Sequence, residues 1–309
     1  TNVRVMIGPA PLMLPSGACG GGVARSRALG AAAAMSTSAA VRARALDRFN
    51  VALIRHGNTN RCANDFERQL TEKGRAQARA AAGFMRELGP FAPVVVSSGA
   101  PRCLETAALS LLHAGFPDAP DHFAVVKPDC MYGGTLQPAG SACFERLGYA
   151  PLRDYRAAGE HMLRYLDAYS ERAVAELHSA AARCGADEVG APRRTLCVYG
   201  HAIYLPSIAL RIACDRELGQ EHIERVLSTN TREACGYYLT DAAVRVLEWT
   251  EEQLAEAAAA EAVAADAESS ERSAGAQEEG LEEAAAPETA AADADGSERS
   301  AGAQARQGA

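Results

Sequence analysis

The feature that most constrains the fold is an apolar run that leads directly into a cation and an imidazole. Residues 51–54 (Val-Ala-Leu-Ile) are followed by Arg55, His56 and Gly57. An uninterrupted apolar run of this length predicts a buried strand. Ligands of open α/β sheets bind at the carboxyl ends of strands, so Arg55 and His56 are candidate site residues. Gly57 allows a sharp turn and a close approach of the backbone to a ligand. A surface Arg-His after an ordinary strand is the competing interpretation.

Apolar strand patterns and amphipathic helix patterns alternate along the chain. We expect strands over residues 50–55, 94–96, 123–127 and 195–199, and a hairpin over residues 236–240 and 244–249. Helices are expected over residues 71–88, 101–112, 155–184, 203–214 and 217–227. This alternation predicts a three-layer α/β/α sandwich with a mostly parallel central sheet.

Composition divides the chain into three stretches. Residues 1–48 carry six arginines and one acid, and residues 251–309 carry fifteen acids and three arginines. We therefore expect a leader over residues 1–48, a folded domain over residues 49–250, and a disordered acidic Ala/Glu-rich tail over residues 251–309. Ala and Glu favour a helical start to that tail, over residues 251–265. The domain between the two ends is almost neutral, which gives no electrostatic case for a nucleic acid partner.

The composition of the leader and the pattern of cysteines indicate the cellular compartment in which we expect the protein. Arginine and serine with almost no acid are typical of a plastid or mitochondrial transit peptide, and a disordered extension is the alternative. Nine cysteines, an odd number without metal-ligand or CxxC spacing, indicate reduced thiols in a reducing compartment, cytoplasmic or organellar. No apolar run approaches the length of a membrane span, so no membrane partner is expected. A partner for the acidic tail is not indicated.

Charged or titratable residues follow each of the four predicted parallel strands. Arg102 lies just beyond the second strand, Asp129 beyond the third and His201 beyond the fourth, in addition to Arg55 and His56 after the first. Two arginine forks directed at one cavity suit a tetrahedral oxyanion such as phosphate. A neutral imidazole beside them can attack phosphorus, and a carboxylic acid can protonate the leaving oxygen. These residues predict a phosphoryl-transfer site.

Several motifs together resemble one known family. They are Leu-Ile-Arg-His-Gly-Asn-Thr (53–59), Leu-Thr-Glu-Lys-Gly-Arg-Ala-Gln-Ala (70–78), Val-Ser-Ser-Gly-Ala-Pro-Arg-Cys-Leu-Glu-Thr-Ala (96–107) and Tyr-Gly-His (199–201). Over about residues 48–250 the chain resembles the histidine phosphatase (phosphoglycerate mutase-like) superfamily. The resemblance implies that His56 is the nucleophile that becomes phosphohistidine. It also implies that Arg55, Arg102 and His201 bind the phosphoryl group and stabilise its charge.

The general acid and the subfamily depend on weaker similarities. Asp129 stands where mutase-type members place a glutamate before His-Tyr-Gly-Gly; Glu145, Asp154 and Glu160 are competing candidates. Residues 65–71 (Asp-Phe-Glu-Arg-Gln-Leu-Thr) resemble the compact phosphohistidine phosphatases of bacterial signalling. That similarity favours a phosphatase over a mutase, and it leaves the need for a general acid open.

The function expected from these residues is a metal-independent phosphatase without a cofactor. Its substrate would be a phosphorylated small molecule or protein. Asn58 and Thr59 are candidate phosphate ligands, or they only cap the loop. Phosphoglycerate mutase activity, a non-catalytic phosphate-binding module, and a metal site of His56, His201 and Asp129 are the alternatives. Arg55 and Arg102 disfavour the metal site, because they would lie against the cation.

Overall fold

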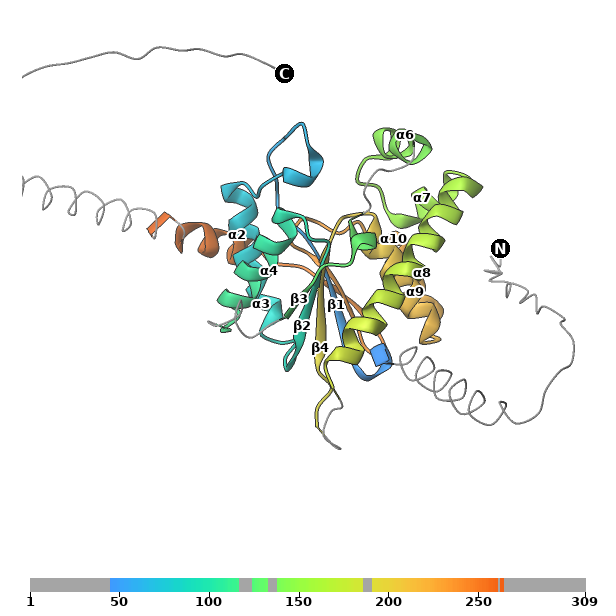
Figure 1. The fold of residues 1–309 in the computed structure, drawn as a ribbon. Helices are drawn as coiled ribbons and strands as arrows, with labels where there is room; N and C mark the ends of the chain where they lie inside the picture. The colour runs from blue at the N-terminus through green and yellow to red at the C-terminus, as the bar shows by residue number, and fades with distance from the viewer. Residues whose placement is uncertain (1–44, 117–123, 133–137, 186–190, 261, 264–309) are drawn as a thin grey trace, which may run out of the picture. The chain divides into compact units, whose positions relative to one another are not determined.

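Six strands form one sheet in the order β3-β2-β4-β1-β5-β6 (Figure 1). The computed structural model describes residues 45–116, 124–132, 138–185, 191–260 and 262–263. The strands are β1 (Asn50–Arg55), β2 (Phe91–Ser97), β3 (Ala124–Val126), β4 (Thr195–Gly200), β5 (Gly236–Leu239) and β6 (Val244–Leu247). β3 pairs with β2, β2 with β4 and β4 with β1, all in parallel. β5 pairs antiparallel with β1 and with β6, and β5 and β6 form the hairpin at the edge. The predicted mostly parallel sheet is confirmed.

Helices cover both faces of the sheet (Figure 1). One face carries α2 (Glu72–Ala80), α3 (Ala82–Met85) and α4 (Pro101–His113); the other carries α8 (Glu160–Arg183), α9 (Tyr204–Asp215) and α10 (Gln220–Ser228). The remaining helices are α6 (Pro138–Leu147), α7 (Leu152–Ala157) and the short 3₁₀ turns η1 (Ala45–Arg48), η2 (Asp65–Glu67) and η3 (Asp129–Met131). The molecule is therefore the three-layer α/β/α sandwich that the sequence predicts.

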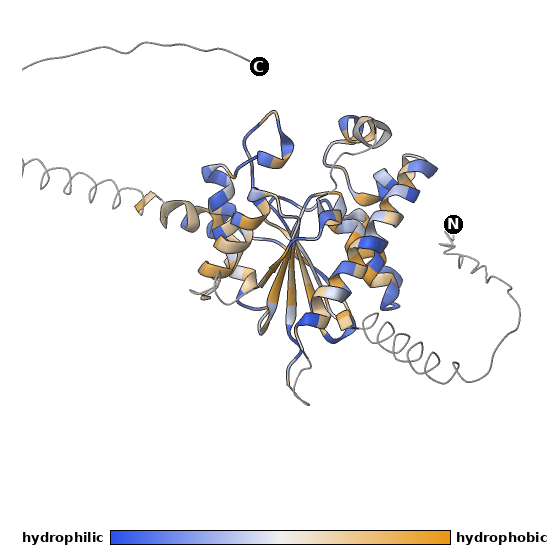
Figure 2. Ribbon diagram, viewed as in Figure 1, coloured by the Kyte–Doolittle hydropathy of each residue, from blue (hydrophilic) through white to orange (hydrophobic). Residues whose placement is uncertain are grey.

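The strands are apolar on both faces because each face packs against a helix layer. Along β1, Val51 and Leu53 contribute to one buried cluster, whereas Ala52 and Ile54 contribute to the other. β4 alternates in the same way. Figure 2 shows the hydrophobic strands at the centre, with the polar sides of the helices turned outward. This two-sided burial explains why β1 reads as an unbroken apolar run instead of an alternating one.

Local signals position the helices that follow β1 and β2. The Thr71 hydroxyl accepts a hydrogen bond from Gly74 N and caps α2, as expected for an N-cap threonine. Pro101 occupies the first turn of α4, where a missing N–H costs nothing. Arg102 is thereby fixed one residue into a helix that begins at the end of β2.

The helix expected over residues 155–184 is two helices, which corrects that prediction. α7 ends at Ala157 and α8 begins at Glu160. Between them Gly159 has φ 128°, a conformation that residues with a Cβ rarely adopt. The amphipathic pattern continues through the break, so periodicity alone does not reveal it.

The start of the acidic tail is helical, as Ala and Glu favour. Residues 251–260 form a helix, and Leu254 and Ala257 pack against the buried cluster on the α2–α4 face. Residues up to Ala258 belong to the same compact unit as the sheet. The division of the whole chain into leader, domain and tail stays a prediction, because residues 1–44 and 264–309 lie outside the described residues.

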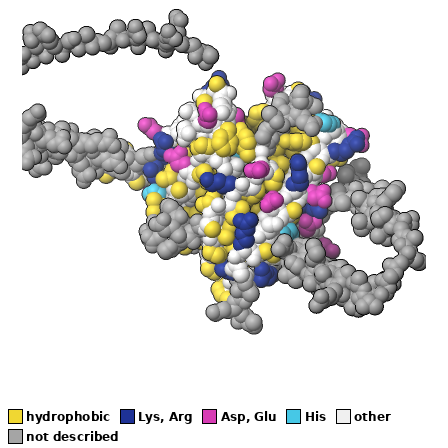
Figure 3. Space-filling model, viewed as in Figure 1, with side chains coloured by type: hydrophobic (Ala, Val, Ile, Leu, Met, Phe, Trp, Pro, Cys, Tyr) yellow, Lys and Arg dark blue, Asp and Glu magenta, His cyan; other side chains and the backbone are white. Residues whose placement is uncertain are grey.

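The surface charges, the cysteines and the helices can each be compared with what the composition predicts. Acidic and basic side chains are interspersed over the face drawn in Figure 3. Eight cysteines lie in the described parts of the chain, and all of them are free thiols. None of the described helices combines the length and the apolar character that crossing a membrane requires.

The loop after β1 presses directly against the first turns of α2. A Cβ built on Gly57 would lie 2.5 Å from Gly74 O, and one built on Gly74 would lie 2.1 Å from Asn58 O. The close approach expected of Gly57 is therefore made to the backbone of α2.

Replacing Gly74 should destabilise the fold by wedging this loop away from α2. We expect Gly74→Ala to lower the free energy of unfolding by about 1–3 kcal/mol, since its Cβ meets backbone atoms. Gly83→Ala is the matched control: it adds the same methyl group within α3 but meets only the mobile end of the Gln253 side chain. Chemical denaturation of both variants measures the difference, and equal stability would contradict the packing described.

Candidate active site

Strand register brings the two predicted catalytic histidines together. β1 and β4 run parallel with Arg55 opposite Gly200, so the residues that follow leave the same edge of the sheet side by side. His56 N donates to Gly200 O at 3.1 Å. The rings of His56 and His201 lie edge to face, with centroids 5.2 Å apart.

Arg102 reaches the same point from the other neighbour of β4. Ser97 at the end of β2 pairs with Tyr199, and α4 starts four residues later. Arg102 Nη2 lies 3.4 Å from His201 Nδ1. The four residues Arg55, His56, Arg102 and His201 are 3%, 8%, 2% and 9% exposed, respectively. The structure thus gathers all four predicted core residues into one buried group at the carboxyl edge of the sheet.

A hydrogen bond fixes the tautomer of His56. Its Nδ1 lies 2.7 Å from Gly57 O, and a carbonyl oxygen only accepts, so Nδ1 carries the proton. Nε2 then holds the lone pair. Burial lowers the pKa of His56 to about 3, opposed by the bond to Gly57 and reinforced by the charges of Arg102, Arg55 and Arg68. The imidazole is therefore neutral at physiological pH.

His201 is neutral for related reasons. Arg102 only donates, so His201 Nδ1 accepts, and Nε2–H donates to Ser98 Oγ at 2.9 Å. Burial, followed by the neighbouring His56 and Arg102, holds the pKa of His201 well below its usual range. Both ring nitrogens of His201 are therefore used within the protein, one of them to orient Arg102.

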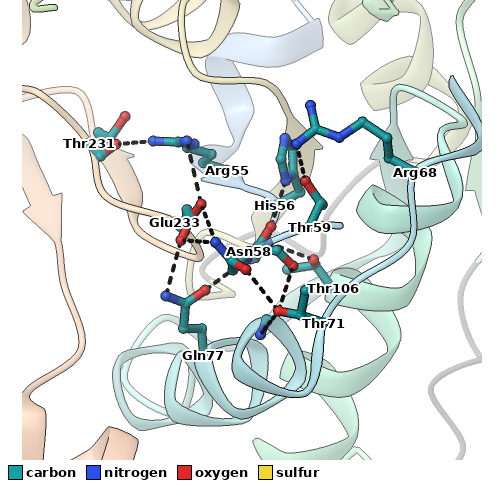
Figure 4. A network of polar contacts seen from close by, with 12 residues as sticks. Arg55, His56, Asn58, Thr59, Arg68, Thr71, Gln77, Thr106, Thr231 and Glu233 are labelled. Carbon is teal, nitrogen blue, oxygen red and sulfur yellow. Dashed lines mark hydrogen bonds and ion pairs between the residues drawn. The ribbon is translucent and has the colours of Figure 1, made fainter. Parts of the chain in front are cut away.

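Arg55 is held along its outer edge (Figure 4). Nη1 donates to Thr231 O at 2.8 Å, Nη2 lies 4.0 Å from a Glu233 oxygen, and the guanidinium carbon lies 4.4 Å from the centre of the Tyr149 ring. Burial lowers the pKa of Arg55 from its usual value. Its buried Nε has no hydrogen-bond partner among the described residues.

Arg102 is held by the loop that carries η2. Nη2 lies 2.9 Å from Asp65 Oδ2, and Nη1 donates to the Asp65 and Phe66 carbonyl oxygens. Partial burial raises the pKa of Asp65, but hydrogen bonds from Arg68, Tyr132 and Arg102 and the Arg102 charge together lower it to about 2. Asp65 is therefore an ionised partner. The buried Nε of Arg102, like that of Arg55, has no hydrogen-bond partner in the described part of the chain.

Asn58 and Thr59 lie beside His56 and are engaged by the protein (Figure 4). Asn58 Nδ2 donates to Glu233 at 3.0 Å, and its Oδ1 accepts from the Thr71 hydroxyl at 2.8 Å. Thr59 Oγ1 accepts from Arg68 Nη2. These contacts fit loop-organising residues, and the role of phosphate ligand stays a prediction for both.

Asp129 is not brought into this group by any contact. It opens η3 at the end of β3, with an exposed side chain and no hydrogen bond or ion pair to another described residue. The competing acids Glu145, Asp154 and Glu160 are also exposed, and Glu160 pairs with Arg164 along α8. Tyr132, which follows η3, does reach the site: its ring lies 5.5 Å from that of His201.

Three charged residues around the site were not predicted from the sequence. Asp65 and Arg68 lie in the stretch that resembles compact phosphohistidine phosphatases, which was a usable signal. Glu233 lies 175 residues from the Asn58 that it binds, and nothing in its sequence neighbourhood marks it. The residues that the structure describes contain no cluster of three or more side chains suited to hold a metal ion.

Three solved structures are similar to this chain in outline. The SixA protein of Agrobacterium tumefaciens has 16% identity and a TM-score of 0.39, covering 66% of this chain and 98% of its own. A mycobacterial glucosyl-3-phosphoglycerate phosphatase has 21% identity and a TM-score of 0.41, and the match covers 67% of this chain and 99% of that protein. The alpha-ribazole phosphatase of Shigella flexneri has 16% identity and a TM-score of 0.41, and the match covers 64% of this chain and 96% of that protein. Each TM-score lies below 0.5, so none of these likenesses bears on the activity of this chain.

The sequence itself matches a family model. No curated protein shows significant similarity to the chain. Residues 51–121, however, match the model of the histidine phosphatase superfamily (branch 1), over a region that contains Arg55, His56 and Arg102. This match covers less than half of the chain, and it confirms the resemblance to the histidine phosphatase superfamily that the motifs indicate.

Proposed function

We propose that this protein is a phosphatase that works through a phosphohistidine on His56. The observation that carries the proposal is a buried, neutral imidazole beside two arginines, with its lone pair on Nε2. The Nε–H groups of Arg55 and Arg102 are buried without a partner among the described residues, and phosphoryl oxygens would supply the acceptors that they lack. A nucleophile and two fixed cations are the parts that phosphoryl transfer requires.

The reaction has two displacements at phosphorus. The His56 Nε2 lone pair forms a bond to phosphorus while the bond from phosphorus to the leaving oxygen breaks, and that oxygen takes up a proton. Water then attacks the phosphohistidine, the phosphorus–nitrogen bond breaks, and the electron pair returns to Nε2 as the water proton is released. Arg55 and Arg102 stabilise the charge on the equatorial oxygens in both steps.

The contacts of the two histidines disfavour a metal centre. A metal centre would need open ligand atoms, but His56 Nδ1 and both His201 nitrogens are already hydrogen-bonded within the protein. A mutase would use the same nucleophile and arginines and would add a second transfer of the phosphoryl group to bound substrate, so it stays the alternative. A non-catalytic module would have no need of a buried, neutral histidine beside two arginines. The substrate is a phosphomonoester or a phosphoprotein.

The first test removes the nucleophile. We expect His56→Ala to lower turnover of p-nitrophenyl phosphate more than about a thousandfold, because no other group can carry the intermediate. Rapid quenching of the wild-type protein should trap an acid-labile phosphorylated peptide containing His56. The matched control is His161→Ala, which removes an exposed histidine on α8. Wild-type turnover by the His56 variant would overturn the mechanism.

The second test follows the charge of His56. Since burial lowers its pKa to about 3, the folded protein should keep His56 neutral as the pH falls through about 6.5, where an exposed histidine protonates. The unfolded chain binds that proton and the native protein does not, so the free energy of unfolding falls as the pH drops below about 6.5. NMR titration of the imidazole signals, with exposed His161 for comparison, checks this. A His56 midpoint near 6.5 would contradict it.

The third test concerns leaving-group protonation by Asp129, which stays a prediction. Protonation of the leaving oxygen matters most for alkyl phosphates, because an alkoxide is a poor leaving group, and least for aryl phosphates, which release a phenolate. Asp129→Asn should therefore lower the rate on alkyl phosphates selectively if Asp129 is the acid. Unchanged rates on both substrate types, which the exposed side chain favours, would show that the site works without Asp129 as an acid. An equal loss on both would make Asp129 a structural residue.

A further inference from the structure

The carboxylate of Glu233 collects donors from separate parts of the chain (Figure 4). Asn58 Nδ2 lies 3.0 and 3.2 Å from its two oxygens, and Gln77 Nε2 lies 3.2 Å from one of them. Arg55 Nη2 lies 4.0 Å from the other. The Glu233 side chain is 24% exposed. Donors from the β1 end, the loop after it and α2 thus converge on one carboxylate.

The donors that meet at Glu233 are themselves fixed. Asn58 N donates to Gln77 Oε1 at 2.8 Å, and Gln77 is only 3% exposed. The Asn58 side chain also accepts from Thr71, the cap of α2. Both ends of the Asn58 and Gln77 amides are therefore bound, and the Glu233 carboxylate accepts from both of them.

The backbone around Glu233 is bonded to the two residues that begin the site. Ala234 N donates to His56 O at 3.2 Å, and Arg55 N donates to Cys235 O at 2.9 Å. Together with the bond from Arg55 Nη1 to Thr231 O, these fasten residues 231–235 to Arg55 and His56. Movement of this segment would be transmitted directly to the catalytic strand end.

The segment holds an unfavourable backbone conformation. Ala234 has φ 53°, in the left-handed region that non-glycine residues seldom adopt. Such a conformation persists only where the surroundings enforce it, and it recurs at functional sites. Here Trp249 Nε1 donates to Glu233 O at 2.9 Å on one side and His56 O accepts from Ala234 on the other.

We infer that Glu233 is a positioning residue of the phosphatase site. Glu233 and Thr231 hold the outer edge of the Arg55 guanidinium, which leaves Arg55 Nε for a phosphoryl oxygen. Glu233 also locks Asn58, and so the loop directly after His56. It acts through these residues, as an acceptor surrounded by donors. The inference rests on the proposed function, because the placement of Arg55 matters for turnover only if a phosphoryl group binds there.

The kinetic test replaces the carboxylate with an amide. In Glu233→Gln, one amide end would face donors from Asn58, Gln77 and Arg55, and the charge opposite Arg55 is lost. We expect kcat for p-nitrophenyl phosphate to fall about 10- to 100-fold, with KM changed far less, and Glu233→Asp to recover part of the loss. Glu105→Gln is the matched control: Glu105 is 28% exposed and pairs with Arg75 at 2.7 Å, between α2 and α4.

A second readout needs no turnover. In arginine-selective ¹⁵N NMR, the held guanidinium of Arg55 should give separate Nη signals in the wild-type protein and in Glu105→Gln. Freer rotation should merge them in Glu233→Gln. The Arg102 signals serve as the internal reference. This measurement separates the two proposals: a wild-type protein that forms no phosphohistidine would refute the function, while the NMR signals would still decide whether Glu233 holds Arg55.

The inference is overturned if Glu233→Gln keeps a wild-type kcat or unchanged Arg55 signals. Circular dichroism and thermal unfolding establish that each variant is folded. If Glu233→Gln does not fold, Glu233→Asp carries the same test, since it keeps the charge but shortens its reach to Arg55. In that case, a folded Glu233→Asp protein with wild-type kcat and wild-type Arg55 signals would overturn the inference.

Discussion

Parallel pairing of β1 with β4 is the interaction on which the site depends. Its register sets Arg55 opposite Gly200, so that His56 and His201 leave the sheet as neighbours. β4 also pairs with β2 on its other side, which brings the start of α4 to the same edge. A shift of one residue between β1 and β4 would turn every β1 side chain to the opposite helix layer, so burial of both faces enforces the register. The register that buries both faces of β1 is therefore also the register that sets His56 beside His201.

The fold and the four central site residues could be predicted because their signals are local. An unbroken apolar run marks β1, Pro101 marks the first turn of α4, and Thr71 marks the start of α2. The rule that ligands bind at the carboxyl ends of parallel strands then gathers residues that are far apart in sequence. Arg55, His56, Arg102 and His201 each needed only a correct strand and this rule.

The supporting residues could not be predicted, because their roles depend on distant contacts. Glu233 acts through Asn58, Gln77 and Arg55, and none of these contacts leaves a pattern around residue 233. The break between α7 and α8 depends on one φ angle, at Gly159, inside an uninterrupted amphipathic pattern. For Asp129, sequence position gave the end of β3, but the direction of a side chain after a strand is set by packing that sequence does not show.

The contact between Trp249 and the segment at residues 231–235 has a thermodynamic consequence. The Trp249 indole donates to Glu233 O, and the Arg232 guanidinium carbon lies 4.2 Å from the centre of its ring. The helix over residues 251–260 follows immediately, and its Leu254 packs against the buried cluster on the α2–α4 face. If a phosphoryl group binds at Arg55 as we propose, these contacts would link its binding to the packing of this C-terminal helix. A ligand that orders residues 231–235 would then also protect residues 249–258 from local opening, which hydrogen exchange measures.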